Sequence, residues 1–570
     1  MRHMDMQARP SNLDELLDNL RLPRQSTESL SFCNADSEAL KQYIHQLPYT
    51  DPPTLCGQLY RNIPEVAGLK AEPAKKQRLL DLLQPVALDC TEKLTRNLAV
   101  NEKNTRVLSL SVAILRSLAE GYKAIIVDNC GRDDMLPGTL VNSIQGALSV
   151  MNRLLLTCWQ TYIQPPGNFW QELHSLYQLA RGFELDTTPA TATPFQGQSV
   201  RTAYLKPLLL ACANPGHYTP TELRSIFDFL DNGAQLAELA PGSERGLFVV
   251  DTQGNKGPVY ASRVSGIAKQ HVRLRPDKLV NLITDMKAES NLKGLPVRIA
   301  DDLCKYWSSE QVREEEHHDD ETEVTVVLGL TRIHRLLAKS KSFEDFLIRL
   351  DQHHHGEDYK LFSDRKPAYL QDQLSAEDAW HDAYDSSDRH FTEHKEKNGS
   401  PESPLDYKPV DIRRKPTAKP IKAYPGMRIN TSRRGACVEL GDTVESLSPG
   451  ELIAVQEKGT EDWQFAIVRW VHTTPRLNRL AGMEFLSGRP RPCAACVVRT
   501  DRPVSPYLPG LLFDPADGAL EVILPSMPFK ARQRVRIMSL DGEFITQLTD
   551  TLESTFHMSR FTLEKGQPEI

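Results

Sequence analysis

The fold of the C-terminal part of this chain is decided by one stretch, Asn430-Thr431-Ser432-Arg433-Arg434-Gly435, followed at once by Ala436-Cys437-Val438-Glu439-Leu440. The alternating residues after the glycine predict a β-strand. An amide and a hydroxyl two residues apart place short polar groups at the strand entrance, where they can hydrogen-bond one edge of a flat heterocycle. The two arginines between them and the glycine can meet phosphate. This hexapeptide carries most of the functional prediction.

Outward from this stretch, the chain after residue 420 alternates with a period of two. We predict strands at Ala436–Leu440, Glu451–Gln456, Gln464–Val471, Leu480–Phe485 and Ala494–Arg499. Short strands at such spacing indicate a β-barrel over residues 409–502. Residues 503–570 predict a second β-rich module without the polar hexapeptide, with strands at Gly510–Phe513, Leu520–Leu524, Gln533–Met538, Glu543–Leu548 and Arg560–Glu564. This module is a companion domain or a degenerate copy of the barrel.

Residues 1–350 predict a mostly helical domain with a small β insertion. Apolar residues at spacings of three and four indicate helices near 74–88, 107–118, 137–163, 169–180, 198–213, 219–237, 276–288 and 330–339. A β-hairpin is expected over 246–251 and 258–261, and a strand over Glu323–Leu328. Residues 351–408 are poor in large apolar side chains, which predicts a flexible polar linker. The fold class expected for the chain is therefore α+β and multidomain.

Composition narrows the class of protein. The formal net charge of −7 gives no electrostatic reason to expect a nucleic-acid partner. No stretch is long and apolar enough to predict a membrane span, and the first residues lack a secretory signal, so we expect a cytoplasmic protein. The 10 cysteines are scattered, apart from the C-x-x-C formed by Cys493 and Cys496, for which we predict packing within a strand.

No catalytic or metal-binding constellation stands out in the sequence. Phosphate-binding loops, nucleophile elbows and zinc-protease motifs are missing, so we do not expect an enzyme. The pair His317-His318 and the run His353-His354-His355 lie in acidic segments that predict no fixed metal geometry. We therefore predict no catalytic residue, no metal and no cofactor.

The barrel region resembles the PilZ domain of bacterial cyclic-di-GMP receptors. That family carries (D/N)-x-S-x-x-G before a strand, as in residues 430–435, and a later strand ending in a glycine and an aromatic, here Leu480-Ala481-Gly482-Met483-Glu484-Phe485-Leu486. The resemblance implies that Asn430 and Ser432 bind a guanine edge and that Gly435 permits close approach. It also implies cyclic-di-GMP as the ligand.

The family's upstream R-x-x-x-R is absent from Asp411-Ile412-Arg413-Arg414-Lys415-Pro416-Thr417-Ala418-Lys419, where only the two lysines have the spacing. We expect the missing contacts to come from arginines at other positions, namely Arg413, Arg414, Arg428, Arg433 and Arg434. The predicted ligand-binding residues are Arg413, Arg414, Asn430, Ser432, Arg433, Arg434 and Gly435. The resulting hypothesis is a regulator that binds cyclic-di-GMP and relays this to a helical domain that binds an unknown protein partner. The alternative is a nucleotide-free scaffold or adaptor.

Overall fold

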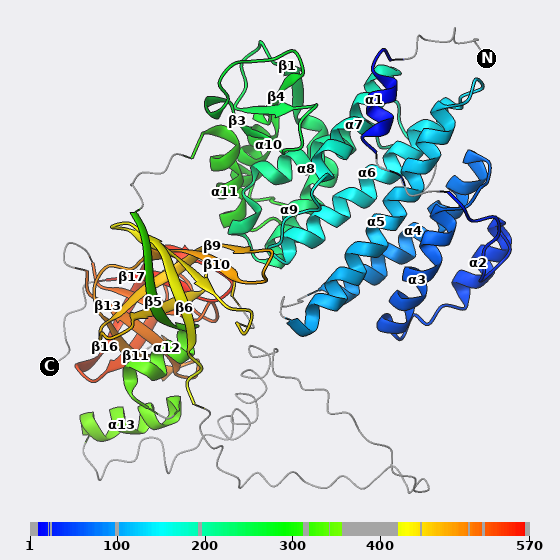
Figure 1. Cartoon of the computed structure of the whole chain (residues 1–570). Helices are drawn as coiled ribbons and strands as arrows, with labels where there is room; N and C mark the ends of the chain where they lie inside the picture. The colour runs from blue at the N-terminus through cyan, green and yellow to red at the C-terminus, as the bar shows by residue number, and fades with distance from the viewer. Residues whose placement is uncertain are drawn as a thin grey trace, which may run out of the picture. The chain divides into compact units, whose positions relative to one another are not determined.

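The computed structural model describes residues 10–20, 22, 25–96, 102–191, 197–311, 318–340, 342–355, 420–444, 447–499, 502–515 and 519–564 (Figure 1). The chain forms two compact units. The first unit comprises Met1–Glu316 and Trp470–Leu480, and the second comprises His317–Arg469 and Ala481–Ile570. Most of the predicted linker, residues 356–408, lies outside the described residues, and its first five residues end a helix.

The first unit is built mainly from helices, several of which run alongside one another as long rods (Figure 1). They are α1 (Leu13–Asp18), α2 (Ser37–His45), α3 (Pro52–Ala67), α4 (Pro73–Thr95), α5 (Glu102–Cys130), α6 (Pro137–Gln160), α7 (Phe169–Gly182), α8 (Val200–Cys212), α9 (Pro220–Gly233), α10 (Asp277–Ala288) and α11 (Val297–Ser308). The predicted helices up to residue 288 are thus confirmed here, whereas the helix predicted at 330–339 forms but belongs to the second unit. Their apolar faces form one continuous core.

The centre of this bundle is α6, whose residues after the first turn are nearly all buried. Gly146 of α6 permits close packing, because a Cβ there would lie 2.5 Å from the ring of Tyr122 in α5. The Tyr122 hydroxyl lies 2.7 Å from an oxygen of Asp81 and 2.9 Å from one of Gln84, both in α4. A single buried tyrosine therefore links three helices.

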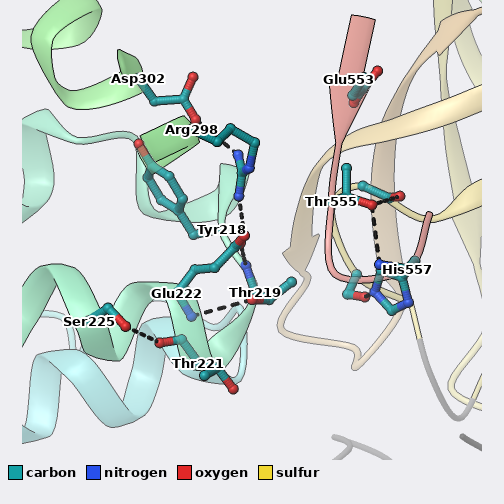
Figure 2. A network of polar contacts seen from close by, with 12 residues as sticks. Tyr218, Thr219, Thr221, Glu222, Ser225, Arg298, Asp302, Glu553, Thr555 and His557 are labelled. Atoms are coloured by element: carbon teal, nitrogen blue, oxygen red, sulfur yellow. Dashed lines mark hydrogen bonds and ion pairs between the residues drawn. The ribbon is translucent and has the colours of Figure 1, made fainter. Parts of the chain in front are cut away.

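Helix α9 begins with Thr219 as its N-cap. The Thr219 hydroxyl accepts a hydrogen bond from the Glu222 amide, and the Glu222 carboxylate accepts one from the Thr219 amide (Figure 2). Such a capping box satisfies two amides that a helix start leaves unpaired. The same carboxylate pairs with Arg298 of α11, which lies 2.9 Å from Asp302. This network joins the ends of two helices in the first unit.

A small antiparallel sheet completes the first unit. Its strands are β1 (Glu238–Pro241), β2 (Phe248–Asp251), β3 (Val259–Tyr260) and β4 (His271–Arg275), in the order β1-β4-β2-β3. The pairing of β2 with β3 confirms the predicted hairpin. Strands β1 and β4, which extend the sheet on the other side of β2, are not predicted from the sequence.

The second unit contains a closed barrel, which we term the first barrel. Its strands are β5 (His318–Leu328), β6 (Tyr424–Thr431), β7 (Gly435–Leu440), β8 (Leu452–Glu457), β9 (Trp463–Thr473) and β10 (Arg479–Phe485), in the order β10-β7-β6-β5-β8-β9. The sequence assigned Glu323–Leu328 to the helical domain. That assignment is wrong, because β5 pairs with β6 and β8.

The remaining strands form a 7-stranded sheet, which we term the second barrel. They are β11 (Pro490–Arg499), β12 (Arg502–Pro503), β13 (Leu508–Phe513), β14 (Glu521–Leu524), β15 (Arg534–Ser539), β16 (Gly542–Ser554) and β17 (Ser559–Leu563). The sequence placed Ala494–Arg499 in the first barrel, which is wrong, because β11 pairs with β13 and β15. Those two pairings close the circuit β11-β13-β14-β17-β16-β15.

Both barrels follow the same path. The six strands that close each barrel can be numbered from one to six along the chain. Going around either barrel, neighbouring strands then follow in the order one, two, three, six, five, four and back to one. The outer faces of β8 and β9 in the first barrel pack on those of β13 and β14 in the second, through residues that include Ala454, Phe465, Leu511 and Ile523. Helices α12 (Leu330–Ala338) and α13 (Phe343–His355) also belong to this unit and cover Ala494 and Met538 of the second barrel.

Candidate functional site

The polar hexapeptide forms the turn between β6 and β7. Asn430 lies inside β6, and Gly435 is the first residue of β7. The Ser432 amide donates a hydrogen bond to the Gly435 carbonyl at 2.7 Å, and the Ser432 hydroxyl lies 3.3 Å from the same oxygen. Four residues thus close a tight hairpin whose two arginines lie at its tip.

A bulge in β6 sets the direction of Asn430. Arg428 pairs with Val438 of β7, but Asn430 pairs with the adjacent residue Cys437, so two steps along β6 match one along β7. Residues two apart in a regular strand share a face. The extra residue therefore places Arg428 and Asn430 on opposite faces, as bulges do when they re-aim a side chain.

Asn430 faces the outside of the first barrel. Val327, Ala454 and Phe465 pack outward against the second barrel. Alternation along each strand and pairing across strands extend this outer face to Glu323, Met427, Glu439, Cys437 and Asn430. Asn430 is half-buried, and its amide makes no side-chain hydrogen bond to any residue in the described part of the chain. This amide is available to a ligand.

The turn packs directly on β10. The Phe485 amide donates a hydrogen bond to the Arg434 carbonyl at 2.8 Å. A Cβ on Gly435 would lie 2.2 Å from the Met483 carbonyl oxygen, a distance that no side chain tolerates. The structure therefore joins the two sequence motifs, the hexapeptide and the segment from Gly482 to Phe485, which lie far apart along the chain.

The arginines of this region divide into two kinds. Arg433 and Arg434 are exposed at the hairpin tip, where they can meet an anion. Arg428 is 11% exposed and pairs with Asp320 and, at 2.6 Å, with Glu457. Burial acts to lower the pKa of Arg428, but the two carboxylates outweigh burial and raise it. Arg428 thus forms internal ion pairs, and the expectation that it supplies a phosphate contact is wrong. Arg413 and Arg414 lie outside the described residues.

The neighbouring strand β5 contributes a residue that sequence reasoning missed. Asp319 is the cross-strand partner of Asn430, and its side chain is exposed. The sequence signal was the run of acids over 314–323, which predicts a solvated loop. That prediction is wrong from His318 onward, where β5 begins. The equivalent turn of the second barrel, between β13 and β14, begins at Asp514 and carries no N-x-S-x-x-G.

Of the other candidate groups, His317 lies outside the described residues, and contacts or burial are clear for His354 and for the cysteines of the C-x-x-C. The His354 ring lies 2.6 Å from the Ser539 carbonyl, and no metal-binding group of His, Cys, Asp and Glu occurs in the described residues. Cys493 and Cys496 are buried in β11, three residues apart and so on opposite faces. Burial raises the pKa of the Cys496 thiol to about 11. Within the described ranges, none of the helices has the length and hydropathy of a membrane span.

Comparisons with known proteins match this architecture in three consecutive parts. Residues 38–243 match the model of the N-terminal domain of the cyclic-di-GMP receptor FimW, residues 247–492 match that of its middle PilZ domain, and residues 493–565 match that of its C-terminal beta-barrel domain. Residues 247–492 are thus similar to a PilZ domain, as the sequence resemblance predicts. The first barrel and the hexapeptide both lie within these residues.

A full-length relative supports the same organisation. The cyclic-di-GMP receptor FimW of Pseudomonas aeruginosa is 26% identical to this chain over 598 residues, covering 96% of this chain and 94% of the relative. The similarity therefore extends through the helical unit as well as both barrels.

Proposed function

We propose that this protein is a cytoplasmic, non-enzymatic regulator that binds cyclic-di-GMP at the β6–β7 turn of its first barrel. The observation that carries the proposal is the position of the N-x-S-x-x-G motif, which forms an exposed hairpin turn with an outward-facing amide and two arginines. The full-length relative is named as a receptor for the same nucleotide, which supports this choice of ligand.

Each residue has a role that follows from its chemistry. The Asn430 amide and the Ser432 hydroxyl read a guanine edge, because both groups donate and accept hydrogen bonds. Arg433 and Arg434 pair with phosphate through planar guanidinium groups. Arg413 and Arg414 add cationic contacts from the segment that precedes β6. Gly435 allows β10 to approach the turn.

The relay to the helical unit runs through the β9–β10 hairpin in this proposal. The tip of that hairpin, Trp470–Leu480, belongs to the first unit. There the Thr473 amide donates a hydrogen bond to the Tyr162 carbonyl at 2.8 Å, and the Thr473 side chain is buried. The other end of β10 touches the ligand turn at Gly435. A ligand that binds one position of β10 more tightly than another thereby shifts the helical unit toward the matching state. The size of the shift is set by the difference in affinity for the two positions of β10.

Titration calorimetry on the full chain tests the binding step. We expect cyclic-di-GMP to bind the wild-type protein and expect the Asn430→Ala/Ser432→Ala double variant to lose most of that affinity. Asp514→Ala, at the equivalent turn of the second barrel, serves as the control and should bind normally. A wild-type protein that releases no heat with the nucleotide would support the scaffold alternative instead.

A further inference from the structure

Three side chains form one cross-strand row on the outside of the first barrel. Asp319 of β5 lies directly opposite Asn430 of β6, which lies opposite Cys437 of β7. Directly opposite residues of antiparallel strands point to the same face, with Cβ atoms about 5 Å apart. The Asp319 carboxylate and the Asn430 amide are therefore side by side, next to the turn that carries Ser432.

The neighbouring carboxylates form ion pairs inside the barrel, but the carboxylate of Asp319 does not. Asp320 points to the opposite face, where it pairs with Arg428, and Glu457 pairs with the same guanidinium. The Asp319 side chain is exposed and forms no ion pair or hydrogen bond with any residue that the structure describes. An unpaired carboxylate beside the proposed site for an anion needs a function, because it would otherwise repel phosphate.

We propose that Asp319 is a guanine-reading residue of the ligand site. This inference depends on the proposed function. The Watson–Crick edge of guanine presents two parallel donors, N1–H and the exocyclic N2–H, and a carboxylate accepts both at once. The adjacent Asn430 amide donates to the guanine O6 acceptor. Adenine offers a lone pair at N1 in place of a donor, so the same carboxylate repels it.

The direction in which nucleotide affinity changes when Asp319 is removed separates guanine reading from simple charge repulsion. If Asp319 were only an acid near a phosphate, its removal would strengthen binding of every cyclic dinucleotide. If it reads guanine, Asp319→Ala weakens cyclic-di-GMP binding about tenfold to a hundredfold, the usual effect of one bidentate base contact. Binding of cyclic-di-AMP should stay the same or improve, so selectivity for guanine falls.

The test is titration of the full chain with cyclic-di-GMP and with cyclic-di-AMP. Asp319→Ala is compared with Asp319→Asn, which keeps the shape but presents one acceptor oxygen, and with Glu321→Ala. Glu321 is an exposed acid two residues along β5 and serves as the matched control. We expect selectivity to fall in both Asp319 variants and to be unchanged in the Glu321 variant, with the same thermal unfolding midpoint in all three.

The outcomes distinguish this inference from the function on which it rests. If wild-type protein binds cyclic-di-GMP and Asp319→Ala binds it equally or more tightly, the guanine-reading role is refuted while the receptor function stands. If wild-type protein binds neither nucleotide, the receptor function fails and this inference fails with it. If Glu321→Ala loses selectivity to the same degree, the effect belongs to the net charge of β5, and the role of Asp319 is refuted.

Discussion

Gly435 has a structural role that is separate from any contact with a ligand. A Cβ at this position would overlap the Met483 carbonyl oxygen, so β10 must move away from β7 to admit it. We expect Gly435→Ala to lower the free energy of unfolding by about 1–3 kcal/mol, the range for overpacked sites. Urea unfolding measures this value.

The control for this substitution lies at the other end of the same strand. Gly441 follows β7, and a Cβ there would meet no atom within 4 Å. Gly441→Ala should change the stability by less than about 0.5 kcal/mol, as substitutions at open surface sites do. If Gly435→Ala unfolds like the wild type, the close packing of β7 on β10 is refuted. Loss of binding in a Gly435 variant alone is therefore weak evidence for a ligand contact.

The residues of the site were only partly predictable from the sequence. The hexapeptide is a local pattern, so Asn430, Ser432 and the arginines at the tip could be named in advance. Asp319 could not, because its position beside Asn430 depends on strand pairing between distant segments. The internal role of Arg428 was hidden for the same reason, since its partners Asp320 and Glu457 come from two other strands.

At the scale of elements, the β9–β10 hairpin is the part whose role can be tested directly. Thr473→Pro removes the amide that donates to the Tyr162 carbonyl in the first unit. We expect this variant to bind cyclic-di-GMP like the wild type. Hydrogen exchange of residues 158–164 should respond to the nucleotide in the wild type and no longer respond in the variant.

The control for this experiment is Arg476→Ala, an exposed residue at the tip of the same hairpin, which should keep the wild-type response. A Thr473→Pro protein in which residues 158–164 still respond would exclude this hairpin as the relay. A wild type that binds the nucleotide without any response there would exclude the relay but leave binding intact.

Prediction of the elements succeeded where the signal is local. Periodic patterns of apolar residues identified α6 and α9. Strand β6 was missed because Pro425-Gly426 is a turn signal, although both residues lie within the strand and Gly426 packs closely on Leu440. Strand β5 was recognised as a strand but placed in the wrong domain, because its partners β6 and β8 follow much later in the chain.

At the scale of the whole molecule, the described part of each unit includes a fully buried histidine that should make its stability depend on pH. In the first unit, His174 Nδ1 lies 2.8 Å from the Tyr204 hydroxyl and Nε2 lies 3.0 Å from the Lys256 carbonyl. In the second unit, His334 Nε2 lies 3.1 Å from the Cys493 carbonyl. Burial lowers the pKa of both rings to about 4.

Each lowered pKa destabilises the folded state at acid pH, because the unfolded chain binds a proton that the buried ring does not take up. This loss of stability is absent well above pH 6.5, the ordinary pKa of histidine, and grows as the pH falls from there toward about 4. The loss approaches about 3 kcal/mol per histidine. We therefore expect hydrogen-exchange protection of α7 and α12, corrected for intrinsic rates, to fall between neutral pH and about pH 5.

His334→Gln isolates the contribution of the second unit, because glutamine does not titrate. In this variant the loss of protection on acidification should disappear from α12 and remain in α7, whatever the substitution does to stability at neutral pH. His353→Gln, at an exposed position of α13, is the control and should keep both losses. If α12 of the His334 variant loses as much protection on acidification as the wild type does, protonation of His334 is not the cause of that loss. Another titratable group must then make the barrels sensitive to acid, because glutamine at position 334 cannot bind the proton.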